Sequence, residues 1–381
     1  MRNISIWLAV AAFFNVESAK HRAKELPQNS LGAKQAIVID NETGECIYEE
    51  NGDERCPPSS MTKLMTLYIL FEAIILGRIG MDDEFPVSKA AQKMTGSRSF
   101  FSAGAMVKVE DLIRSIIVHS GNDACIVVAE GISGDVEAFV DVMNEKVKEF
   151  GLQNTHFTNP SGLPDEEHYS TVHDISVIVR RIISDFPAFY HYFAEKSFTI
   201  NSITQQNRNT LLGNTMKVDG LKTGRTDAGG FGVAASAENE GKRLIVVVNG
   251  CKTSRSRARA ANKLLAKGFG EYTPLKIAEA GKPVTSISVW LGTKDLVNLC
   301  THEDVIVAIS KKHQKSLKVE AYLREPVEAP ISIGMKLGEL VYSYGNGVIK
   351  KKDLLACSSV PRACFARRAE MSLKRLIFGE K

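Results

Sequence analysis

The chain has 381 residues, of which 44% are apolar and 24% charged, an ordinary composition for a globular protein whose length predicts two domains. The formal charge of only +4, without basic runs interleaved with aromatic residues, argues against nucleic-acid binding. The seven cysteines are scattered without a C-x-x-C pair, so no metal or redox framework is indicated and no cofactor is expected. One pair could form a disulfide in an exported chain, but the sequence does not say which.

The first 19 residues have the pattern of a secretory signal peptide. A positively charged start, Met1-Arg2-Asn3, precedes an apolar run over residues 4–14 that only a serine interrupts. Small residues near Ser18 suit cleavage, although the cleavage position stays open. The alternative is a buried N-terminal strand or helix. Residues 1–19 therefore predict export.

A β-hairpin over residues 35–50 and a long helix after Pro57-Pro58 are the next predicted elements. The hairpin has two apolar runs around a turn-rich connector. After the prolines, apolar side chains recur with the helical period, at Leu64, Leu67, Tyr68, Phe71, Ile74 and Ile75. We expect Ser59 to be the N-cap. Ser60 then lies in the first turn, where free N–H groups favour developing negative charge.

The helical pattern returns over residues 110–150, with a loop at Ser120-Gly121-Asn122. The segment 151–175 is rich in Asn, Pro and Gly and predicts an ordered loop that leads to a helix from about Val172. Two strands and a basic helix complete this region, at residues 230–237, 243–249 and 254–268. Strands at both ends with helices between them predict an α/β (α+β) fold around a mainly antiparallel sheet.

Beyond Tyr272 the pattern changes to short apolar runs separated by turn residues. It predicts a small all-β domain at residues 273–358, after a larger domain at residues 31–272. Residues 361–381 hold six basic and two acidic residues. On a helical projection their apolar and basic side chains separate, which predicts an amphipathic helix lying on a membrane surface. The alternative is a terminal helix that packs on its own protein or frays.

Three short motifs, Ser60-Met61-Thr62-Lys63, Ser120-Gly121-Asn122 and Lys222-Thr223-Gly224, together predict an activated nucleophile. Each alone has an ordinary interpretation as a cap or a turn. Residues three apart share a helix face, so the Ser60 hydroxyl and the Lys63 amine can meet. A lysine can act as the base only if burial or a nearby positive charge lowers its pKa. We expect Lys222 to supply that charge.

The remaining motif residues fit an acyl-transfer reaction on a peptide. Ser120 can relay a proton to the leaving amine, and Asn122 can hold the substrate amide. The strand that carries Lys222-Thr223-Gly224 can pair with an extended substrate backbone. An oxyanion hole needs backbone N–H groups, which Ser60 and the strand after Gly224 can provide.

In this order the three motifs resemble those of the penicillin-binding protein and serine β-lactamase superfamily. Four stretches resemble the low-molecular-mass serine D-alanyl-D-alanine carboxypeptidases more closely, at residues 57–66, 119–124, 159–171 and 218–224. The resemblance covers residues 33–272. It implies a β-lactamase/transpeptidase-like fold, with Ser60 as nucleophile and Lys63 as base.

The same resemblance implies a substrate, an inhibitor and a location. The substrate would be a peptidoglycan pentapeptide that loses its terminal D-alanine, and β-lactams would inhibit by acylating Ser60. The family is exported to the cell envelope. We therefore expect a periplasmic protein that is attached peripherally to the inner membrane through the C-terminal helix.

A free substrate carboxylate needs a cation, and by the resemblance Arg257 takes this role. Arg255 is the alternative, and Arg208 is expected to support the site. Thr223 and Gly224 complete the expected substrate-binding residues. Arg225 departs from the family pattern, which often has histidine after the third motif. It would either add carboxylate affinity or change the deacylation rate.

Other functions stay open at this point: a weak β-lactamase, a D,D-endopeptidase, or a non-catalytic cell-wall-binding protein. Class A β-lactamases activate the deacylating water with a loop glutamate. Glu166 and Glu167 lie in the loop, but Ser170 and Thr171 stand where an asparagine would follow. An endopeptidase would need a more open groove. The intact motifs argue against a binding-only protein.

Overall fold

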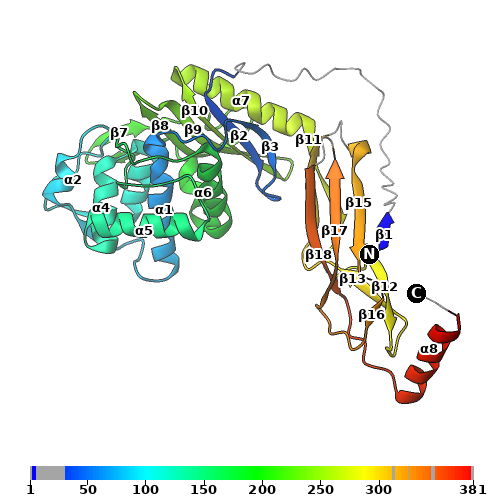
Figure 1. Cartoon of the computed structure of the whole chain (residues 1–381). Coiled ribbons are helices and arrows are strands. Elements are labelled where there is room, and N and C mark those ends of the chain that lie inside the picture. The colour runs from blue at the N-terminus through cyan, green and yellow to red at the C-terminus, as the bar shows by residue number, and fades with distance from the viewer. Residues whose placement is uncertain (1, 6–30, 311–313, 325, 345–347, 379–381) are drawn as a thin grey trace. The chain divides into compact units, whose positions relative to one another are not determined.

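The computed structural model describes residues 2–5, 31–310, 314–324, 326–344 and 348–378. It divides into two compact units, one of residues Ala23–Gly270 and one of Glu271–Lys381 together with Met1–Arg22 (Figure 1). The division falls next to the boundary predicted after residue 272. Each unit has a hydrophobic core of its own.

The larger unit is built on a five-stranded antiparallel sheet with the order β3-β2-β10-β9-β8. Its strands are β2 (Gln35–Asp40), β3 (Cys46–Glu50), β8 (Val218–Thr226), β9 (Gly230–Asn239) and β10 (Lys242–Cys251). Ile245 and Val247 belong to the core on one face of β10, whereas Leu244 meets Gly268 of α7 (Ser254–Glu271) on the other. Because side chains alternate along a strand, both faces of the sheet are covered. β8 lies at the edge of this sheet.

A layer of helices lies on the sheet face opposite α7 (Figure 1). The helices are α1 (Lys63–Ile75), α2 (Lys89–Lys93), α3 (Val109–Arg114), α4 (Asn122–Ser133), α5 (Val136–Glu149) and α6 (Val172–Asp185), with 3₁₀ turns at Ser59–Thr62 and Pro187–Ala194 and a π-helical turn at Ser115–His119. This layer contacts the sheet mainly through α6 and the 3₁₀ turns. Two short hairpins complete the unit, β4 (Glu84–Pro86) with β5 (Met106–Lys108) and β6 (Ser197–Ile200) with β7 (Ile203–Gln206). α1 contacts α4, α5 and α6, and its Leu64 and Phe71 are fully buried. The predicted α/β fold with a mainly antiparallel sheet is confirmed.

The start of α1 differs from the prediction. Ser59 does not cap the helix: its backbone has a φ of +52°, and its hydroxyl donates to Thr226 Oγ1 at 3.2 Å. An N-cap side chain must instead accept an N–H of the first turn. The N-cap prediction is wrong because the chain enters through a tight 3₁₀ turn packed on β8. Ser60 nevertheless lies in this first turn.

The smaller unit contains a seven-stranded sheet with the order β1-β15-β17-β18-β13-β12-β16 and a separate β11–β14 pair. The strands are β11 (Tyr272–Ala278), β12 (Thr285–Trp290), β13 (Leu296–Cys300), β14 (Val305–Ser310), β15 (Lys318–Leu323), β16 (Val327–Glu328), β17 (Lys336–Tyr344) and β18 (Val348–Ala356). A short 3₁₀ turn, Gln314–Ser316, precedes β15, and helix α8 (Phe365–Phe378) follows the sheet. The predicted all-β character is confirmed.

Only Arg2–Ser5 of the predicted signal peptide is described. It forms strand β1, which pairs antiparallel with β15. Residues 6–19 lie outside the described residues, so the signal peptide stays a prediction.

All seven cysteines are free thiols. Burial raises the pKa of Cys125 and of Cys251 to about 11. A protonated thiol is a poor nucleophile, so both behave as core residues at neutral pH.

Candidate active site

Ser60 and Lys63 meet as their spacing predicts. The amine Nζ of Lys63 lies 3.1 Å from Ser60 Oγ, and the lysine has no exposed surface. Nζ also donates to Asn122 Oδ1 at 2.8 Å and to the carbonyl of Ser161 at 2.5 Å. Thr95 orients the amide group of Asn122, because the NH₂ of Asn122 donates to the carbonyl of Thr95 at 2.7 Å.

These contacts fix the direction of the Lys63 lone pair. A neutral amine has two N–H groups, and the oxygens of Asn122 and Ser161 can only accept. They therefore take both N–H groups. The lone pair is left for the third neighbour, the Ser60 hydroxyl.

The environment of Lys63 favours the neutral amine. Burial lowers its pKa to about 8, opposed by Cys125 and Asp123 and assisted by the positive charge of Arg208. Burial disfavours the charged form of an amine because the low-dielectric interior solvates it poorly. Burial is thus the main cause of the shift, and the assisting positive charge is that of Arg208 rather than that of Lys222, which the sequence had suggested.

The second and third motifs meet across the same site. Lys222 Nζ donates to Ser120 Oγ at 2.9 Å, and both residues are buried. Burial lowers the pKa of Lys222 well below its ordinary value, and the charge of Lys63 acts in the same direction. Ser120 has a φ of +60° at the junction between the π-helical turn and α4. Such a conformation costs about 1–3 kcal/mol and is typical of functional sites.

A cavity of about 500 Å³ opens above these groups. The predicted residues that line it are Ser60, Ser120, Arg208, Thr223, Gly224, Arg225 and Arg257. Sequence reasoning missed the other lining residues, Gly96, Ser97, Phe231 and Ser254. They belong to a loop, a strand and a helix start with no motif of their own, so no sequence signal could have found them.

Of the two candidate cations on α7, Arg257 reaches the cavity. It is 5% exposed, and it donates to the carbonyl of Arg208 and to Ser254 Oγ, both at 3.1 Å. Arg255 is exposed and does not line the cavity. In the described part of the chain neither Arg257 nor Arg208 forms an ion pair, so their charge is available to an anion. Arg208 donates to Ser97 Oγ at the cavity wall.

Arg225 lies at the rim of this cavity. Its guanidinium pairs with Asp227 at 3.0 Å and lies 5.2 Å from the ring centroid of Phe231. The side chain is 61% exposed. Asp227 partly neutralises its charge, so Arg225 is a weaker anion site than Arg257.

The loop after α5 contributes the Ser161 carbonyl rather than a carboxylate to the Lys63 environment. Glu166 and Glu167 line a second cavity of about 720 Å³, beyond the end of β8, together with Pro57 and Tyr169. Neither glutamate lines the cavity that contains Ser60. The loop therefore does not offer the carboxylate that a class A β-lactamase needs.

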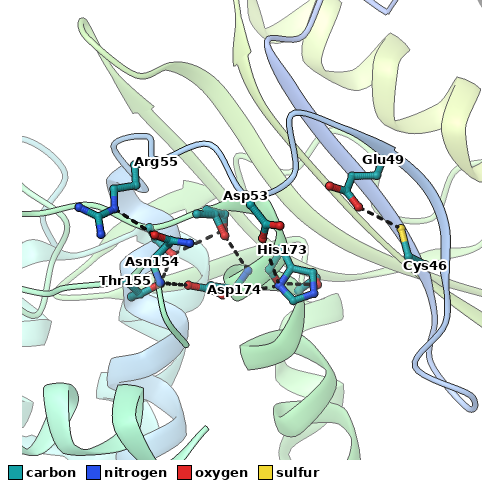
Figure 2. A network of polar contacts seen from close by, with 11 residues as sticks. Cys46, Glu49, Asp53, Arg55, Asn154, Thr155, His173 and Asp174 are labelled. Atoms are coloured by element: carbon teal, nitrogen blue, oxygen red, sulfur yellow. Dashed lines mark hydrogen bonds and ion pairs between the residues drawn. The ribbon is translucent and has the colours of Figure 1, made fainter. Parts of the chain in front are cut away.

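A polar network joins this loop to the chain that enters the site (Figure 2). Arg55 Nε donates to Asn154 Oδ1 at 3.2 Å. The backbone N–H of Asn154 and the hydroxyl of Thr155 donate to Asp174 Oδ2, at 3.1 and 2.7 Å. Asp174 lies in the first turn of α6. The network therefore holds the start of the loop against the segment that leads to Pro57.

A half-buried serine beside a fully buried lysine, together with a second lysine bonded to a second serine, defines a serine-dependent acyl-transfer enzyme. The edge strand β8 and the two arginines at the cavity fit a peptide substrate with a free carboxylate. The chain belongs to the D-alanyl-D-alanine carboxypeptidase family, which matches residues 20–253. The penicillin-binding protein 5, C-terminal domain, family matches residues 272–362.

Individual relatives agree over most of the chain. The D-alanyl-D-alanine carboxypeptidase DacD of Salmonella typhimurium is 39% identical over 332 residues, 85% of each chain. The structure of penicillin binding protein 5 from Haemophilus influenzae is 37% identical with a TM-score of 0.82, covering 87% of this chain and 98% of that one. Penicillin-Binding Protein D2 from Listeria monocytogenes, in its ampicillin-bound form, is 29% identical with a TM-score of 0.59, covering 64% of this chain and 100% of that one.

Proposed function

We propose that this enzyme removes the terminal D-alanine from peptidoglycan pentapeptides through an acyl-enzyme on Ser60. The observation that carries the proposal is the environment of Lys63, whose two N–H groups are taken by Asn122 and Ser161. The free lone pair then faces the Ser60 hydroxyl at 3.1 Å. Family membership and the names of the relatives supply the substrate class.

In the acylation step Lys63 takes the Ser60 proton as Oγ attacks the carbonyl carbon of the penultimate D-alanine. We expect the N–H groups of Ser60 and of Arg225 to stabilise the oxyanion. When the C–N bond breaks, Ser120 gives its proton to the leaving amine and regains one from Lys222 through their hydrogen bond. The proton that Lys63 took from Ser60 then passes to Lys222 through solvent, so both lysines return to their starting state. In deacylation the neutral Lys63 takes a proton from the attacking water and gives it to the Ser60 oxygen as the ester bond breaks.

The substrate carboxylate is expected to bind beside Lys222, Thr223 and Arg257. Arg257→Gln should raise KM by about 10- to 100-fold for a peptide with a free C-terminal carboxylate, since hydrogen bonds to charged groups contribute about 1.5–3 kcal/mol. The exposed Arg255→Gln, two residues earlier on α7, is the matched control and should not change KM. The same variants are also measured on the peptide carboxamide, which lacks the carboxylate. An equal rise in KM on that substrate would contradict the role of Arg257 in carboxylate binding.

The reaction is tested by incubating the purified protein with pentapeptide precursor and identifying products by mass. Release of one D-alanine per peptide is expected. Cleavage of cross-linked dimers in preference to pentapeptide would indicate an endopeptidase. Rapid multiple turnover of a chromogenic cephalosporin, without a persistent adduct on Ser60, would indicate a β-lactamase and refute the proposal.

We also propose export through residues 1–19 and peripheral attachment to the inner membrane through α8. Phe365 and Leu376 on α8 are 78% and 84% exposed, as an interfacial helix requires. Two of its basic residues pair with acids, Arg367 with Asp295 and Lys374 with Glu370, which reduces the free positive charge. Among the described helices none is long and apolar enough to cross a membrane. Deleting residues 361–381 should release the protein, and an unchanged membrane fraction would count against attachment.

A further inference from the structure

We infer that His168 is a positioning residue for Lys63, because it holds the loop whose Ser161 carbonyl directs the lone pair toward Ser60. The inference rests on the proposed function, in which Lys63 is the base. His168 does not line the cavity that contains Ser60. It would therefore act through the loop and not on the substrate.

The ring of His168 bridges the loop and the helix start. The ring is buried, its Nδ1 accepts the backbone N–H of Thr158 at 3.0 Å, and its Nε2 lies 2.8 Å from Thr62 Oγ1. Because Nδ1 accepts from an amide, the ring proton is on Nε2 and is donated to Thr62. Burial lowers the pKa of His168 to about 4, with Asp165 opposing and His156 and Lys63 assisting. The neutral tautomer that this bridge needs is thus the one present at neutral pH.

The two ends of the His168 bridge are next to Lys63 and next to Asn159, which shapes the turn at Ser161. Thr62 directly precedes Lys63 in the chain. Thr158 directly precedes Asn159, whose Oδ1 accepts the N–H groups of Gly162 at 2.8 Å and Leu163 at 3.0 Å. This carboxamide closes the turn that presents the Ser161 carbonyl.

The middle of the turn is fixed to α1 and to the 3₁₀ turn. Thr66 Oγ1 donates to the carbonyl of Pro160 at 2.7 Å. Gly162 has a φ of +80°, and a Cβ there would lie 1.8 Å from the carbonyl oxygen of Ser59. The loop backbone therefore packs directly on the turn that carries Ser60, and a shift of the loop moves the Ser161 carbonyl away from Lys63.

Loss of the bridge should affect chemistry more than binding. Without the Ser161 acceptor, one N–H of Lys63 loses its partner and the amine can rotate, so the lone pair faces Ser60 for less of the time. The groups expected to bind the substrate carboxylate, Thr223 and Arg257, do not contact His168. We therefore expect His168→Ala to lower the saturating acylation rate by about 10- to 100-fold, the effect typical of misplaced reacting groups, with the non-covalent Kd unchanged.

The experiment measures acylation of the full-length protein by a fluorescent penicillin in stopped flow, with the thermal midpoint of each variant. His168→Gln keeps an N–H that can reach Thr62 and should recover most of the rate. Thr62→Val should reproduce the loss while His168 stays in place. The exposed His191→Ala is the matched control and should acylate normally.

A purely structural role for His168 would lower the thermal midpoint and the active fraction but leave the saturating rate of the active fraction unchanged. A folded His168→Ala that acylates at the wild-type rate overturns the inference. If His168→Ala does not fold, a wild-type rate in Thr62→Val overturns it instead. Ser60→Ala is included to separate the two proposals: label on that variant would overturn the proposed function and this inference with it, whereas a silent Ser60→Ala beside a fully active His168→Ala overturns only the role of His168.

Discussion

Ser60→Ala is expected to abolish covalent labelling by penicillin and to lower D-alanine release by about 10⁴-fold or more, the loss typical of a removed nucleophile. Ser60 is the cavity residue whose hydroxyl lies next to a buried amine with a directed lone pair. The other motif serine, Ser120, is bonded to Lys222 instead. Removing the Ser60 hydroxyl leaves no comparable nucleophile at this position.

The neighbouring Ser59→Ala is the matched control. Ser59 is buried, and its hydroxyl donates to Thr226 and not to a base. We expect this variant to label like the wild type and to lose only about 1 kcal/mol of stability, the usual contribution of one hydrogen bond. The intact mass of each variant after penicillin treatment shows whether a covalent adduct has formed. An adduct on Ser60→Ala that maps to Ser120 would show that the wrong serine was assigned.

Much of the fold could be predicted because its signals are local. The hairpin of β2 and β3, the helix α1 and the β9–β10 pair each follow from periodicity and turn residues within a short stretch. The pairing of β2 with β10 joins segments some 200 residues apart in the chain. No local pattern specifies that pairing. The 3₁₀ turn at Ser59 was also missed, because its geometry depends on a contact with β8.

The candidate site also has parts that local sequence patterns predict and parts that they do not. The Ser60–Lys63 contact follows from helical spacing and was predicted. From the sequence, Arg257 is preferred to Arg255 only through the family resemblance. The structure adds a physical reason, because Arg257 is buried at the cavity and Arg255 is exposed. The Ser161 carbonyl could not be predicted by residue type, since every residue has a backbone carbonyl. Its position depends on a turn that Asn159 closes and that Thr66 holds from a distant part of the chain.

Lys63→Arg is expected to lower the acylation rate by about 10³-fold or more, although it keeps the positive charge. A guanidinium has a pKa above about 12 and offers no lone pair near neutral pH. A guanidinium can also donate to the oxygens of Asn122 and Ser161, which accept from Lys63, so the loss would report the missing base. The exposed Lys89→Arg is the control for the substitution itself and should acylate normally.

The pH profile of acylation separates the two buried lysines. The reactive form of Lys63 is the neutral amine, and burial lowers its pKa to about 8. The wild-type rate should therefore fall about tenfold for each pH unit below 8, because the neutral fraction falls by that factor, and should level off above it. In Lys63→Arg the acylation rate should be low and should not increase with pH. Burial also lowers the pKa of Lys222 well below its ordinary value, so a rise that persists in Lys63→Arg and disappears in Lys222→Arg would make Lys222, and not Lys63, the titrating group.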